Sequence, residues 1–132
     1  MKIATNLKQS RRLIEILPYE TADMHYAFFA ICGEEFQEVV DASATLLPGN
    51  KNKRFPFEYA WSLSALLENL PASLRDKEDH ELILFIEKEH TDYHIGYRRN
   101  TTKFTVIDVF PCDDLVDACY ELILKLRENK LI

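Results

Sequence analysis

Two histidines and two aspartates in the C-terminal half of the chain have side chains that could bind a metal ion. They are His90, Asp92, His94 and Asp113. Imidazole and carboxylate groups are suitable ligands for zinc and related cations. A His-x3-His pair converges on one ion when it lies on one helix turn, whereas this pair flanks an expected turn between two strands. The spacing therefore favours a solvated turn, and we expect neither a bound metal nor another cofactor.

A cysteine close to the expected start of the last helix is the candidate nucleophile. A helix N-terminus can stabilise the thiolate of Cys112, but Asp113, Asp114 and Asp117 follow it within one turn and should raise its pKa. No sequence pattern provides a base for this thiol, and the three glycines form no phosphate-binding loop. We therefore expect no catalytic residue. A hydrolase or metal enzyme that uses these acids remains an alternative.

The balance of charge argues against a nucleic-acid-binding protein. The chain has 22 acidic and 16 basic residues and a net charge of −6, whereas nucleic-acid binding depends on neutralising phosphates.

From Ser62 onwards the expected order is helix, three strands, helix, which is also the order in double-stranded RNA-binding domains. Such a domain needs cations where the last helix begins, but that end carries five acids: Glu89, Asp92, Asp113, Asp114 and Asp117. The basic clusters lie elsewhere, at Lys51, Lys53 and Arg54 and at Arg98, Arg99 and Lys103. We therefore expect no binding to nucleic acid.

The elements that would position these groups are clearest in the C-terminal half. Apolar or alternating residues at 82–86, 93–97 and 104–110 predict three strands, and the short polar links predict an antiparallel meander. The first of these strands is apolar on both faces, so both faces should be covered. After Pro111 the apolar residues recur at the spacing of a helix, which predicts the last helix. Its apolar face is formed by Leu115, Ala118, Cys119, Leu122, Ile123 and Leu126.

The N-terminal half predicts two shorter helices and further extended segments. Asn6 and Gln9 can cap a helix that Pro18 stops, and Ser62 can cap a second helix over 63–70. The other segments are a strand over 24–32, an ambiguous segment over 34–47, a polar loop over 48–54 and a charged connection over 72–79. The ambiguous segment fits a helix or a strand, and we favour the helix. Aromatic rings at 55, 57, 59 and 61 alternate, which predicts the core face of an extended segment.

These elements predict a single α+β domain over residues 1–132, a length sufficient for one hydrophobic core. We expect one antiparallel sheet, in which the three-strand meander is extended by 24–32 or 55–61. Helices pack on this sheet, and the C-terminal helix is the longest of them.

The last helix has a wider apolar surface than contact with one sheet requires. Beyond its main face, a second apolar stripe is formed by Val116, Tyr120, Leu124 and Leu131. We favour packing of the N-terminal helix over this stripe. The alternative is a partner-binding surface, for another protein or for a second copy of the chain.

Three blocks of the sequence together resemble a family of small uncharacterised proteins encoded on prophages and other mobile elements of gut bacteria. The blocks are LKQSRRLIE at 7–15 with ETADM at 20–24, AWSLSALLE at 60–68 with Leu70-Pro71, and LVDACYE at 115–121. The resemblance spans nearly the whole chain, with 33–54 as a variable insert. It implies a cytoplasmic protein of a bacterial host and no catalytic activity.

The sequence and this resemblance lead to one expected function and one further alternative. We expect a small non-enzymatic accessory protein of a mobile element that acts through protein–protein contacts. We also expect it in the cytoplasm and away from membranes, since the sequence shows no signal peptide and no apolar run of membrane-spanning length. The alternative is an acidic inhibitor that imitates nucleic acid and occupies a host defence protein.

Overall fold

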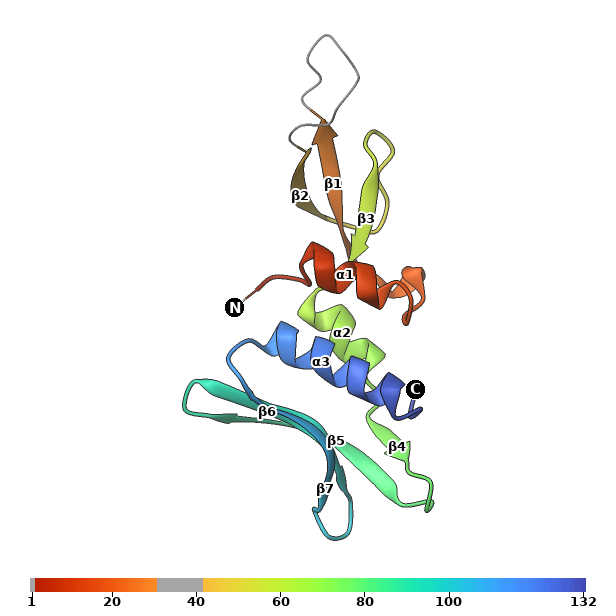
Figure 1. Ribbon diagram of the computed structural model, residues 1–132, viewed down its shortest axis with the longest axis vertical. Helices are drawn as coiled ribbons and strands as arrows, with labels where there is room; N and C mark the ends of the chain where they lie inside the picture. The colour runs from red at the N-terminus through yellow and green to blue at the C-terminus, as the bar shows by residue number, and fades with distance from the viewer. Residues whose placement is uncertain (1, 31–41) are drawn as a thin grey trace.

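The computed structural model describes residues 2–30 and 42–132 and shows an α+β fold, as the sequence predicts. Figure 1 shows an elongated molecule with a sheet at each end and three helices between them. The elements in chain order are α1 (Leu7–Leu13), β1 (Met24–Ala30), β2 (Ala42–Pro48), β3 (Phe57–Ala60), α2 (Leu63–Asn69), β4 (Ser73–Arg75), β5 (Glu81–Glu89), β6 (Asp92–Arg99), β7 (Thr105–Cys112) and α3 (Leu115–Glu128). A short 3-10 turn, Tyr19–Thr21, precedes β1.

The strands form two separate antiparallel sheets, where we expected one. The predicted meander is present as β5-β6-β7, but β1 and β3 do not extend it. They pair with β2 in a three-stranded sheet of order β2-β1-β3. The free edge of β5 is occupied by β4, which lies in the segment expected to be a charged connection. A strand of three residues is too short to show an alternating pattern in the sequence.

The ambiguous segment contains a strand, so the predicted helix is wrong for residues 42–47. Ala42–Pro48 pairs with β1 in a continuous seven-residue register. The spacing of its apolar residues fits a helix and a strand. The strand forms because its backbone can hydrogen-bond to β1. Residues 34–41 of this prediction lie outside the described residues, as do Ile31 and Cys32 of the predicted first strand.

The predicted helix starts are confirmed. Asn6 and Gln9 form a reciprocal capping box at α1, and the Ser62 hydroxyl accepts the N–H of Ala65 at α2. The α1 helix ends at Leu13, before Pro18, and Ile16 and Leu17 continue as turns that bond back to the Leu13 carbonyl.

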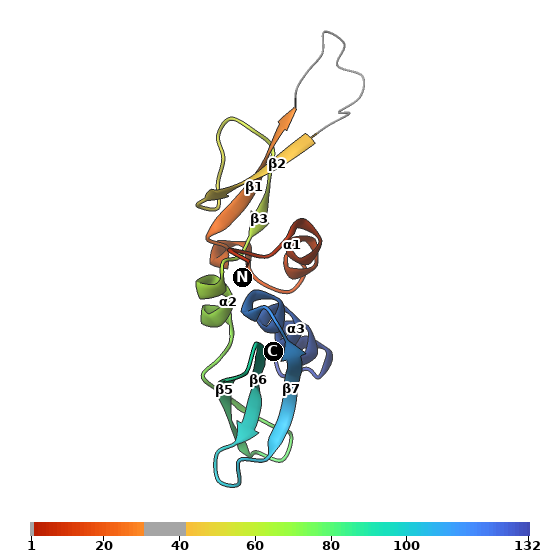
Figure 2. The same ribbon diagram turned by 90° about the vertical axis from the view of Figure 1, so that its left-hand side faces the viewer.

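The hydrophobic core lies around α3, between the two sheets (Figure 2). Helix α3 covers one face of the four-stranded sheet and packs against α2 on its other side. Leu122 and Leu126 are fully buried, as predicted. Leu13 of α1 and Leu66 of α2 belong to the same core cluster. The helices therefore join the two sheets through one continuous core.

Candidate functional site

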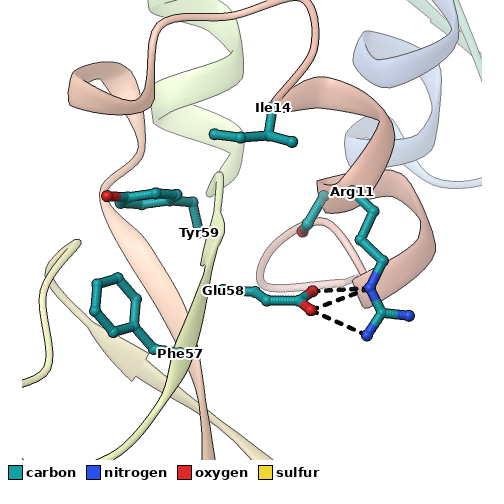
Figure 3. Close-up of a pocket in the computed structure, with 6 residues that line it drawn as sticks. Arg11, Ile14, Phe57, Glu58 and Tyr59 are labelled. Carbon is teal, nitrogen blue, oxygen red and sulfur yellow. Dashed lines mark hydrogen bonds and ion pairs between the residues drawn. The ribbon is translucent and has the colours of Figure 1, made fainter.

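A groove runs between helix α1 and strand β3. Its cavity has a volume of about 260 Å³. Figure 3 shows Phe57 and Tyr59 on one side of β3 and Glu58 on the other, with Ile14, the residue that caps the C-terminus of α1, near Tyr59. The lining residues are Ser10, Arg11, Ile14, Phe57, Glu58 and Tyr59. Because residues from both faces of β3 line it, the cavity lies along the edge of this strand.

The backbone of β3 presents unpaired hydrogen-bonding groups along this edge. Strand β3 ends the sheet order, so β1 is its only neighbour among the described strands. The N–H of Phe28 donates to the carbonyl of Pro56 at 2.9 Å. Since alternate residues of an antiparallel strand face the neighbour, Glu58 is also directed at β1. Phe57 and Tyr59 therefore direct their N–H and C=O groups away from β1, where no described residue binds them.

The side chains of the groove give it one apolar rim and one charged rim. Tyr59 lies with its ring centroid 5.4 Å from that of Phe57 and 5.4 Å from that of Tyr19. Ile14 and Tyr19 leave 41% and 48% of their surface exposed beside these rings. On the opposite rim, the guanidinium of Arg11 binds both carboxylate oxygens of Glu58, with Nε to Oε2 at 2.9 Å. Such a groove can hold an apolar side chain next to a polar backbone.

The sequence identified only part of this groove. The alternating rings were predicted to share one core face, and Trp61 is indeed fully buried, with its indole N–H donating to Thr21. Phe57 and Tyr59 are only half-buried and line the groove. The groove residues Arg11 and Ile14 were missed, because Ile14 fits the apolar spacing of the expected N-terminal helix and its 41% exposure is visible only in the structure.

The outer face of the four-stranded sheet, opposite α3, carries a row of stacked side chains. The His94 ring lies between Phe85 and Phe110, at centroid distances of 4.8 and 4.9 Å. The guanidinium carbon of Arg98 lies 3.7 Å from the centroid of Phe85. The second apolar face of β5, which we expected to be covered, is thus partly covered by side chains of β6 and β7.

The candidate metal ligands are not brought together. The Nε2 atom of His94 lies 2.7 Å from a carboxylate oxygen of Asp108, which is outside the predicted set. This pair holds the imidazole in one orientation. His90, Asp92 and Asp113 do not bind this pair, and His90 and Asp113 are exposed. Within residues 2–30 and 42–132, no group of three His, Cys, Asp or Glu side chains could hold a metal ion.

Two of the five acids near the start of α3 are bound by Lys2. Asp114 caps the helix by accepting the N–H of Val116 at 2.9 Å, and it also accepts the backbone N–H of Lys2 at 2.7 Å. Asp117 binds the ammonium of Lys2 at 2.7 Å and the side-chain amide of Gln9 at 2.7 Å. Partial burial alone would raise the pKa of Asp117, but these hydrogen bonds hold that pKa below its usual value. The acids are thus not a continuous ridge of free carboxylates.

We predict no complex between this protein and duplex RNA or DNA at physiological salt. Glu89 and Asp113 remain exposed at the end of the sheet where phosphates would have to bind, and a binder must neutralise phosphate charge. Mobility-shift assays at low micromolar protein and about 150 mM salt measure this directly. A complex that weakens steeply with added salt would contradict the prediction.

The two cysteines in the described part of the chain are poor nucleophiles. Burial raises the pKa of the Cys112 thiol, and the carboxylates of Asp117, Asp113 and Asp114 raise it further, as the sequence predicts. Cys119 is fully buried, and burial raises its pKa to about 12. Cys32 lies outside the described residues.

The chain's own core covers the second apolar stripe of α3 only in part. Val116 is fully buried in the cluster that contains Leu13. Tyr120 and Leu131 are half-buried and pack against the same cluster, and Leu124 is half-buried. Val116 is therefore covered from within the chain, while the other three keep part of their surface exposed.

In comparisons with known proteins, no family model, curated protein or solved structure matches this chain. In the described part of the chain, no helix combines the length and apolarity needed to cross a membrane.

Proposed function

We propose that this chain is a protein-binding module that holds an extended segment of a partner protein in the groove between α1 and β3. The observation that carries the proposal is the pair of unpaired backbone positions, Phe57 and Tyr59, beside a cavity of about 260 Å³. A groove between a helix and the edge strand of a sheet is a recurring site for strand addition. In that mode backbone hydrogen bonds provide affinity and side-chain pockets provide specificity.

The groove defines the chemistry of the segment. Its backbone pairs with the N–H and C=O groups of Phe57 and Tyr59, so it is extended and lacks proline where it faces them. One apolar side chain enters the cavity beside Ile14, where an anchor residue of a protein interface would be buried. Polar neighbours of that anchor lie along the Arg11–Glu58 rim.

A comparison with strand β7, an edge strand of the four-stranded sheet, favours β3 as the site. Strand β7 ends the four-stranded sheet, but its pairing with β6 contains two register shifts. The ammonium of Lys125 also binds the carbonyl of Asp108 at 2.6 Å on β7. Bulges and lysines are devices that keep edge strands from pairing with other chains. The residues of β3 that line the groove show neither feature.

The biological setting belongs to the same proposal. We propose an accessory protein of a phage or mobile element that acts in the cytoplasm of a bacterial host through this contact. The resemblance of the three sequence blocks supports the setting, and the groove supports the mode of contact.

Peptide selection tests the proposed function. We expect displayed random peptides selected on the protein to share an apolar anchor and to bind with micromolar Kd, as single-segment sites do. Ile14→Glu places a charge at the apolar rim and should weaken binding at least tenfold, by about 1.4 kcal/mol. Ile86→Glu is the matched control, because Ile86 is also 41% exposed but lies on the other sheet. Equal affinity in both variants would refute the groove as the site.

A further inference from the structure

We propose that a second cavity, beside the turn between β6 and β7, binds the phosphate or carboxylate group of a small ligand. This cavity is separate from the groove, because it lies on the four-stranded sheet. Its volume is about 180 Å³. Three cationic side chains, an amide and two apolar side chains line it: Arg98, Arg99, Lys103, Asn100, Ile83 and Phe85. In a chain with a net charge of −6, this is a local concentration of positive charge that can attract an anion.

Arg98 is held in place for such a contact. Its guanidinium carbon lies 3.7 Å from the centroid of the Phe85 ring, and its Nη2 donates to Glu87 at 2.7 Å. Its Nε atom is buried and has no hydrogen-bond partner. A guanidinium fixed by an aromatic ring and one carboxylate loses little freedom when it binds an oxyanion. The unpaired Nε–H is a donor that a ligand oxygen can satisfy.

Lys103 adds a further cation, whereas Arg99 borders the cavity from the other face of the sheet, since it pairs with Leu82 and Arg98 pairs with Ile83. The Nε of Arg99 is also buried without a hydrogen-bond partner, but its Nη2 forms an ion pair with Glu78 at 3.6 Å. Among the residues that the structure describes, none forms an ion pair with the Lys103 ammonium. The turn that carries both is closed by hydrogen bonds from the Lys103 N–H to the Arg99 carbonyl and from the Arg99 N–H to Phe104.

The nearby acids leave donors of Arg98 and Lys103 available. Glu87 occupies only one nitrogen of Arg98, and Glu81 reaches the Asn100 amide at 3.4 Å, the limit of a hydrogen bond. An oxyanion in the cavity would form charge-assisted hydrogen bonds, which are about twice as strong as neutral ones. The apolar wall formed by Ile83 and Phe85 favours an anionic group attached to an apolar or aromatic body over a free inorganic ion.

Nuclear magnetic resonance of the arginine Nε–H groups tests this site. We expect phenyl phosphate or benzoate to shift the Arg98 signal in a saturable way and more than the Arg99 signal, and inorganic phosphate to bind more weakly. Arg98→Gln and Lys103→Gln should each weaken binding about tenfold. Lys103 is exposed in the turn, so its variant tests the site even if loss of Arg98 disturbs the packing on Phe85. Arg75→Gln is the control, because Arg75 is an exposed arginine of the same sheet paired with Asp79.

Three results would overturn the inference. The first is the absence of saturable shifts with all three probes. The second is an affinity that Arg98→Gln and Lys103→Gln lower no more than Arg75→Gln does. The third is tighter binding of a single-stranded oligonucleotide than of phenyl phosphate at equal phosphate concentration, which would assign the cations to a polymer.

Discussion

Replacing Gly96 with alanine is expected to destabilise the protein by about 3 kcal/mol, at the upper end of the cost of overpacking a core. A Cβ atom on this residue would overlap the carbonyl oxygen of Ile107 and lie 2.8 Å from the Cα of Asp108. Both obstacles belong to the backbone of β7, so no side-chain rotation can relieve them. The variant must separate β6 from β7, which are paired at Gly96 and Asp108.

Denaturant unfolding measures this loss, and Gly49→Ala is the control. Gly49 has a φ of +82° with open space around its Cα, so alanine there should cost only about 1 kcal/mol of backbone strain. Equal midpoints for the two variants would show that β6 and β7 do not approach as closely as described.

Leu122→Ala is expected to lower the free energy of unfolding by about 2–5 kcal/mol, because the removed methyl groups leave a cavity in a packed core. Leu122 is fully buried in α3, in the cluster that joins both sheets through the helices. The unfolding midpoint should fall while its slope stays unchanged. Leu124→Ala, at a half-buried position on the same helix, should cost less. A loss below about 0.5 kcal/mol for Leu122→Ala would mean that this face of α3 does not meet the core.

The sequence predicted the elements with strong local signals. The capping box at Asn6, the Ser62 cap and the long C-terminal helix have short-range signatures and are all present. The number of sheets was not predictable in the same way, because β1 is compatible with either sheet until the helix layer separates them. The strand over 42–48 depends on pairing with β1, a contact that the local residue pattern of 42–48 does not specify.

The groove depends still more on tertiary structure. Alternating rings suggested a core face, but whether Phe57 and Tyr59 are fully covered depends on where α1 lies against β3. The unpaired backbone groups follow from the position of β3 at the end of a sheet, which no residue type reveals. The salt bridge between Arg11 and Glu58 likewise joins two residues from different elements.

The most direct test of strand addition in the groove is a residue-by-residue measurement of backbone amides in the presence of a selected peptide. Phe57 and Tyr59 direct their N–H groups toward the groove, whereas Glu58 and Ala60 direct theirs toward β1. Peptide binding should therefore shift the amide signals of Phe57 and Tyr59 and slow their hydrogen exchange, while Glu58 and Ala60 change little. Equal changes at all four amides, or changes confined to the four-stranded sheet, would contradict the proposed binding mode.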